Sequence, residues 1–239
     1  MSSLIDTAYP STPGISRGFC FRPMSASLSG AGLRQALPDF RRGRSVNDAT
    51  TNIEELLPVD PKEIPRLIVV CGVPGAGKST LALHAIGRWG AVSFASENFA
   101  DELGAEARTF SGDLTKAAIT HAYSAMGAAV TAALKSNKLV LAVGSFRAEH
   151  QRTSFRDIAT SRGASVTALR IVCPTALASK RVRLRIAEGE RGPTERVIRQ
   201  IDAELNRAAD IDVTLRNDTS IEAFHRCIDV LIEPLIGCA

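Results

Sequence analysis

The stretch LIVVCGVPGAGKST, residues 67–80, joins an apolar segment to an amphipathic one through a turn rich in glycine. Its first five residues, Leu67 to Cys71, have the apolar, β-branched composition of a buried strand. Leu81, Ala85 and Trp89 follow at the spacing of one helix face. Glycines in between allow positive φ and let successive backbone N–H groups approach an anion that a side chain would keep away. The stretch therefore predicts a strand, a phosphate-binding loop and a helix in direct succession.

The turn matches the motif G-x-x-x-x-G-K-[ST] at every fixed position. In this motif Lys78 reaches the β- and γ-phosphates of a nucleotide, Ser79 ligates Mg²⁺, and the following helix points its positive end at the same anion. We therefore predict binding of ATP or a related nucleoside triphosphate with Mg²⁺. The alternative is a glycine-rich turn that has lost its ligand. The residues expected to hold the nucleotide are Gly72, Val73, Pro74, Gly75, Ala76, Gly77, Lys78, Ser79 and Thr80.

Length and composition indicate one folded domain with a tail. The chain has 239 residues, of which 45% are hydrophobic and 23% charged, so it is neither disordered throughout nor collagen-like. The net charge is +4 and aromatic residues make up 5%, so nucleic acid is expected only as an end substrate. No run approaches the roughly 18 apolar residues that cross a bilayer, and no membrane partner is expected.

The first 50 residues differ from the rest of the chain. They contain eight serines, six arginines and only three acidic residues, without sustained apolar periodicity. A linker with three prolines, Pro58 to Pro65, follows, so residues 1–65 are predicted to be a disordered leader and residues 66–239 the folded domain. The five cysteines form no CxxC pair, which predicts a reduced, cytoplasmic protein. Because the leader also resembles organelle transit peptides and bacterial secretion signals, delivery elsewhere stays an alternative.

Strand-like and helix-like segments alternate from Arg66 onward, which predicts an α/β fold with three layers, a parallel sheet between helices. The predicted strands are residues 67–71, 91–94, 139–144, 166–172 and 212–215. The predicted helices are residues 78–89, 97–103, 114–136, 148–162, 175–187, 195–208 and 221–236. In the third helix a spacing of three and four predicts one packed face formed by Ala118, His121, Ala122, Ala125, Ala129 and Ala132.

Residues after the loop disfavour two classes of protein that share it. A GTPase needs an N-K-x-D base-reading motif, and Asn137-Lys138-Leu139-Val140 fails at its last position. Motor and ABC-type ATPases need further modules, for which about 165 residues leave no room. An Arg-rich helical segment with Arg181, Arg183 and Arg185 is instead similar to a kinase lid, which closes over phosphates during transfer. The alternative is a solvated helix face with charge pairing.

These segments together resemble the small P-loop kinases, a group that includes polynucleotide kinase, gluconate kinase, chloramphenicol phosphotransferase and zeta toxin and is often filed under AAA-domain ATP-binding proteins. The resemblance covers residues 66–234 and rests on the loop, on Gly144-Ser145-Phe146, and on Cys173-Pro174-Thr175 with the arginines after it. It implies a five-stranded parallel sheet in the order 2-3-1-4-5, with the acceptor site at the carboxyl ends of the strands.

The resemblance also implies roles for single residues. Lys78 and Ser79 match the phosphate and Mg²⁺ positions, and Glu97 matches the position of a carboxylate that accepts the proton of the acceptor hydroxyl. The alternative for Glu97 is an acid favoured by a helix N-terminus. Further matches are the lid arginines Arg181 and Arg185, the basic position of Arg152, and Asn217-Asp218-Thr219 where adenine is commonly cradled.

The sequence departs from the family pattern at two positions. Val143 stands where the third strand usually ends in Asp, and Ala100 stands where an acceptor-side Arg is usual. Two functions therefore stay open: an ATP-dependent phosphotransferase acting on a hydroxyl of a small molecule, nucleotide or nucleic-acid end, or a catalytically degenerate nucleotide-binding protein, such as a secreted effector. The acceptor is not readable, because the helical region between residues 97 and 136 carries no motif.

Overall fold

The computed structural model of the chain describes residues 64–109, 113–137 and 139–236. The leader expected over residues 1–65 lies outside the described residues except for its last two positions. Within the described ranges, no helix is both long and apolar enough to cross a bilayer.

Five parallel strands form one sheet in the order β2-β3-β1-β4-β5, which confirms the predicted order. The strands are β1 (Arg66–Cys71), β2 (Val92–Ala95), β3 (Leu139–Val143), β4 (Ser165–Val172) and β5 (Val213–Arg216). β1 lies at the centre, where Val69 pairs with Ala142 of β3 on one side and with Ala168 of β4 on the other. The last five residues of β1 are buried, because a central parallel strand is covered on both faces.

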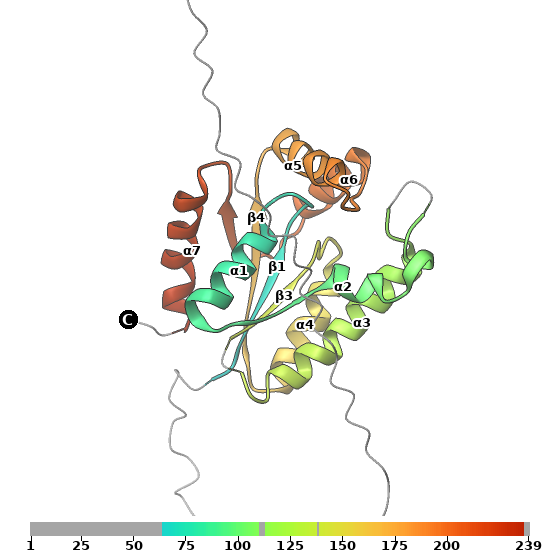
Figure 1. Ribbon diagram of the computed structural model, residues 1–239. Coiled ribbons are helices and arrows are strands. Elements are labelled where there is room, and N and C mark those ends of the chain that lie inside the picture. The colour runs from blue at the N-terminus through green and yellow to red at the C-terminus, as the bar shows by residue number, and fades with distance from the viewer. Residues whose placement is uncertain (1–63, 110–112, 138, 237–239) are drawn as a thin grey trace, which may run out of the picture. The chain divides into compact units, whose positions relative to one another are not determined.

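Helices cover both faces of the sheet, as the three-layer prediction requires. They are α1 (Lys78–Trp89), α2 (Ser96–Asp101), the 3₁₀ helix η2 (Gly104–Ala107), α3 (Lys116–Ala133), α4 (Glu149–Ser161), α5 (Thr175–Ala187), α6 (Glu195–Leu205) and α7 (Ile221–Ile236). α1 packs with α7 on one face and α3 with α4 on the other, while α5 and α6 lie above the end of the sheet (Figure 1). The η2 turn was not predicted from the sequence.

The predicted packed face of α3 is wrong in its second half. Ala118 and Ala122 are buried as expected, but the face continues through Met126 and Val130. Ala132, by contrast, is exposed. Alanines occur on every side of this helix, so their spacing alone does not show which face is packed. The larger Met126 and Val130 side chains gain more free energy from burial and decide that face.

An ion pair between the buried Arg152 and the partly exposed Asp210 ties α4 to the turn before β5. Arg152 is 2% exposed, and its Nε donates to Asp210 Oδ2 at 2.7 Å. A second guanidinium nitrogen donates to the carbonyl of Phe146. The hydrogen bond from Arg152 holds the pKa of the Asp210 carboxyl below its usual value of 3.8. Arg152 was matched from the sequence to a basic position after the third strand, and its contacts show that it links three segments of the fold.

Asp210→Ala is expected to lower the free energy of unfolding by about 2–4 kcal/mol, because it leaves a buried guanidinium without its counter-ion. Urea denaturation measures this loss. The matched control is Glu195→Ala, which breaks only exposed ion pairs, with Arg199 and Arg183, and should cost less than about 1 kcal/mol. Equal losses in the two variants would contradict the assignment.

The same pair predicts an acid-side change in stability. Because the pKa of Asp210 is lower in the folded state, its contribution is complete at neutral pH and is lost as the pH falls below the ordinary value of 3.8. Below that pH, wild type and Asp210→Ala should converge in stability.

Candidate functional site

The glycine-rich loop lies at the carboxyl end of β1, between Cys71 and the first residue of α1, Lys78. Gly75 and Gly77 have φ angles of +83° and +106°, which L side chains rarely adopt. A Cβ at Gly77 would lie 2.0 Å from Asn217 Nδ2, and one at Gly75 would lie 2.5 Å from the Ala178 carbonyl oxygen. At the observed φ angles, a side chain at Gly77 would meet Asn217 and one at Gly75 would meet α5, so this loop conformation favours glycine at both positions.

The side chain of Lys78 folds back over the loop. Its Nζ donates to the carbonyl oxygens of Gly72 and Val73, both at 3.0 Å. Burial lowers the pKa of Lys78, and the nearby carboxylate of Glu97 opposes this shift. Carbonyls carry only partial negative charge, so a phosphate oxygen is a stronger acceptor for this ammonium than the two groups it contacts. The geometry leaves Lys78 ready to exchange carbonyls for an anion.

Two side chains from outside the loop brace it. The buried Asn217, directly after β5, donates from Nδ2 to the Ala76 carbonyl oxygen at 2.7 Å. Arg181 of α5 donates to the Gly75 carbonyl oxygen at 3.2 Å. The residues predicted to hold the nucleotide fall into two groups. Gly72, Val73 and Ala76 are buried, and the others line a cavity.

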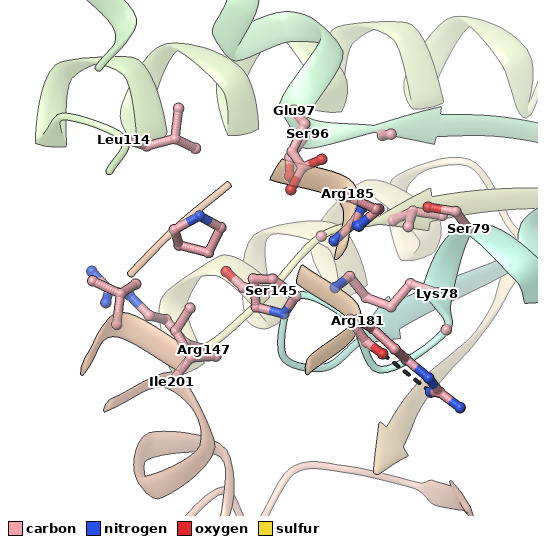
Figure 2. Close-up of a pocket in the computed structure, with 18 of the residues that line it drawn as sticks. Lys78, Ser79, Ser96, Glu97, Leu114, Ser145, Arg147, Arg181, Arg185 and Ile201 are labelled. Carbon is pink, nitrogen blue, oxygen red and sulfur yellow. Dashed lines mark hydrogen bonds between the residues drawn. The ribbon is translucent and has the colours of Figure 1, made fainter. Parts of the chain in front are cut away.

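A cavity of about 880 Å³ opens at the carboxyl ends of the strands. It is lined by Lys78 and Ser79 of α1, Glu97 of α2, and Arg181 and Arg185 of α5, so the structure brings together side chains far apart in the sequence. Figure 2 shows Glu97 across the cavity from Lys78, with Arg185 between them. Ser79 and Glu97 are exposed, so a solute can reach the Ser79 hydroxyl and the Glu97 carboxylate.

The remaining arginine of the proposed lid turns away. Arg183 is 70% exposed, forms an ion pair with Glu195 at 3.6 Å, and does not line the cavity. Arg185, which does line it, lies 3.8 Å from Glu190, and both side chains are partly exposed. Arg181 and Arg185 of α5 thus lie on the cavity and Arg183 on a solvated face, so the charge-paired surface holds for Arg183, while the lid role of the other two stays a prediction.

Sequence reasoning missed a cluster of hydroxyls at the end of β3. The Phe146 N–H donates to the Tyr123 hydroxyl oxygen at 2.8 Å, and that hydroxyl lies 3.3 Å from Ser145 Oγ. Burial raises the pKa of Tyr123. Phe146 has a φ of +44°, a strained value for a bulky residue, and its hydrogen bond to Tyr123 holds it there. Tyr123 is one of only two tyrosines in the chain and sits in the alanine-rich helix, which is the one signal that could have marked it.

The two departures from the family pattern have different surroundings. Val143, the last residue of β3, is 4% exposed and lines the cavity, so the usual acidic position is apolar here. Ala100 is fully buried against Ala107, Ala118 and Ala122, so an arginine at position 100 has no room in this packing.

Among the described residues, no group of three or more His, Cys, Asp or Glu side chains is arranged to hold a metal ion.

A parallel sheet of this order, with a glycine loop after the central strand and a cavity at the strand ends, defines the P-loop NTPase fold. The chain belongs to the AAA domain family, whose model matches residues 67–209.

Solved structures show the same fold. The APS kinase of Mycobacterium tuberculosis, in complex with AMPPNP and APS, has a TM-score of 0.53 and 19% identity over 70% of this chain and 98% of its own. The gluconokinase of Sinorhizobium meliloti has a TM-score of 0.53 and 16% identity over 74% and 98%. The tunicamycin resistance protein of Deinococcus radiodurans has 0.51 and 20% over 70% and 95%. No curated protein matches the chain.

Gly77→Ala is expected to lower the free energy of unfolding by about 2–4 kcal/mol, because the new methyl group meets Asn217 at a left-handed φ. The control is Gly87→Ala in the last turn of α1, where the methyl group meets nothing within 4 Å. That variant should gain up to about 0.5 kcal/mol from helix propensity. Chemical denaturation measures both, and a Gly77→Ala protein as stable as wild type would refute the packing described.

Proposed function

We propose that the protein is an ATP-dependent phosphotransferase that moves the γ-phosphoryl group to a hydroxyl of a small molecule or nucleotide. The observation that carries the proposal is that Lys78 and Glu97 line one cavity. Lys78 is the lysine of the phosphate-binding motif, and Glu97 is a solvent-exposed carboxylate. A protein that only binds a nucleotide has no need of a carboxylate opposite its phosphate loop. In this proposal residues 66–239 are the catalytic domain and residues 1–65 a leader.

The residues present suit a nucleotide with its magnesium ion. Gly75, Gly77 and the first residues of α1 line the same end of the cavity, where backbone N–H groups and the helix N-terminus would stabilise phosphate oxygens. Ser79 is exposed beside Lys78 and offers its hydroxyl to Mg²⁺. Since Val143 supplies no carboxylate, the remaining ligands of the ion would be phosphate oxygens and water, a set that Mg²⁺ commonly accepts. Bound there, the ion would neutralise charge on the phosphates.

The chain's own groups can account for the transfer step. The acceptor oxygen forms a bond to the γ-phosphorus, the bond from that phosphorus to the bridging oxygen breaks, and its electron pair leaves with ADP. Glu97 takes the hydroxyl proton, a role that suits an ionised carboxylate at the cavity wall. Arg185 and Arg181, from the lid helix α5, stabilise the charge on the transferring group. Closure of α5 and α6 over the cavity would exclude water during the step.

The second candidate function is nucleotide binding without transfer, with a partner protein recognising the ATP-bound form. Val143 favours it, because the position at the end of β3 is apolar and 4% exposed. The two functions differ in the step after nucleotide binding, since ADP release that depends on an acceptor belongs only to the first.

Lys78→Ala is expected to abolish acceptor-dependent ADP release, since it removes the side chain that contacts the β- and γ-phosphates. Glu97→Gln should lower kcat by about 10²–10⁴ while changing the KM for ATP little, because only proton transfer is lost. A coupled ADP assay over a broad acceptor panel measures both. Tight ATP binding with no turnover in the wild type would instead support the second candidate.

Val143→Asp is expected to raise kcat if the protein is a kinase that has drifted from the family pattern, because a carboxylate there supplies a further anchor for Mg²⁺ and its water. Val143→Asn is the control of similar size without charge. Thermal unfolding of each variant is measured beside the rate, since a buried acid also costs stability. An unchanged kcat in a folded Val143→Asp protein would show that the acid is not needed.

A further inference from the structure

The cavity is more basic than a phosphate loop alone requires. Its described lining contains six basic side chains and three acidic ones. The basic residues are Lys78, Arg108, Arg147, Arg181, Arg185 and Arg196. Lys78, Arg181 and Arg185 are at the loop end, where a triphosphate would use them. Arg147 and Arg196 come from other elements, so their charges call for a separate explanation.

Arg147 lies at the other end of the cavity. It follows β3 in the turn before α4, and Figure 2 shows it beside Ile201, with Ser145 between it and Lys78. Its Nε is 3.5 Å from Glu204 Oε2, with 29% and 32% of the two side chains exposed. A close charge-assisted hydrogen bond has a distance of about 2.7–2.9 Å, so this ion pair is loose. The guanidinium of Arg147 therefore keeps donors for another anion.

Arg196 belongs to the first turn of α6 and lines the same cavity. Within the described residues it forms neither a hydrogen bond nor an ion pair. The backbone that carries it is nevertheless held in place, because the Thr194 N–H donates to Asp113 Oδ1 at 3.0 Å. That contact also occupies one of the acidic groups at this end. Arg196 is thus an exposed cation that lines the cavity, and its side chain has no counter-ion among the described residues.

The walls beside these arginines are apolar. Leu114 and Ile119 line the cavity on one side, and Val197 and Ile201 of α6 line it on another. Figure 2 shows Leu114 and Ile201 on opposite sides of this end. Such walls favour a compact carbon skeleton over an extended polyanion, since they bury hydrocarbon and offer few hydrogen bonds.

We propose that the acceptor is a small hydroxylated anion, a carboxylate or a phosphate monoester, whose anionic group binds Arg147 and Arg196. Its hydroxyl then points back toward Glu97, which takes the proton as the phosphoryl group is transferred. Guanidinium groups suit both anions, because their paired N–H donors match the oxygens of either. This inference rests on the proposed function for the transfer step, but anion binding at Arg147 and Arg196 does not depend on turnover.

The first experiment measures binding without turnover. The protein is saturated with AMPPNP and Mg²⁺, so the loop end is filled, and calorimetric titrations are then made with glycerate, shikimate, glycerol 3-phosphate and neutral glycerol. Binding of at least one anion, with glycerol silent, is expected. A response to glycerate or shikimate alone identifies a carboxylate site, and a response to glycerol 3-phosphate alone identifies a phosphate site. No binding of any anion overturns the inference.

Variants then assign the site. Arg196→Gln and Arg147→Gln should each weaken binding of the responding anion about 10-fold or more, since each removes a charge-assisted contact. Arg196→Lys should recover part of the affinity. The matched control is Arg199→Gln, one turn further along α6, whose side chain is 71% exposed and pairs with Glu195. Equal weakening in Arg199→Gln would show a general effect of charge and would contradict a specific site.

The two proposals fail in different ways. Lys78-dependent phosphorylation of neutral acceptors only would leave the phosphotransferase function standing and overturn the anionic acceptor. Anion binding that depends on Arg196, without transfer to any acceptor, would leave the anion site standing and overturn the phosphotransferase function. Where transfer occurs, Arg196→Gln should raise the KM for the anionic acceptor much more than it lowers kcat, which a merely structural role would not produce.

Discussion

The backbone of the glycine loop is the constraint on which the rest of the site depends. Gly77 packs so closely against Asn217 that a methyl group has no room, and the Asn217 amide in turn holds the Ala76 carbonyl at 2.7 Å. This packing links β1, α1 and the residue after β5, so the loop keeps its shape before any ligand arrives. Among the described residues, Lys78 Nζ donates only to carbonyl oxygens, both at 3.0 Å, and its burial makes an anionic partner more favourable.

The topology of the sheet builds the rest of the cavity around this loop. Parallel strands all end at one edge, so the turns after β1, β2 and β3 bring Lys78, Glu97 and Ser145 to the same cavity, although 67 residues separate the first from the last. Helices α5 and α6 lie above that edge (Figure 1), and their arginines Arg181, Arg185 and Arg196 line the cavity. Basic side chains near the glycine loop, the carboxylate of Glu97, and the two further arginines Arg147 and Arg196 thus line a single cavity. Such an order suits transfer from a nucleotide to an anionic acceptor.

The predicted sheet order, all five strands and the P-loop fold are confirmed, because β-branched runs and the loop motif carry strong local signals. The predicted packed face of α3 was wrong in its second half, because alanines lie on every side of the helix and differ little in the free energy that they gain on burial. Arg152 was matched to a basic position after the third strand, but only the fold reveals that this buried side chain pairs with Asp210. Tyr123 and Arg196 were missed because neither belongs to a motif, and their place in the cavity depends on how distant segments pack. The roles assigned to Lys78, Ser79, Glu97, Arg181 and Arg185 stay predictions.

A crystal structure of the protein with AMPPNP and Mg²⁺ is the most direct test of whether the glycine loop and Lys78 bind the triphosphate. We expect triphosphate oxygens to lie about 2.7–3.2 Å from the backbone nitrogens of Gly75, Gly77 and Lys78. We also expect Lys78 Nζ to leave the carbonyls of Gly72 and Val73 for the β- and γ-phosphates. A nucleotide bound elsewhere, or a Lys78 that keeps both carbonyl contacts beside a bound nucleotide, would contradict it.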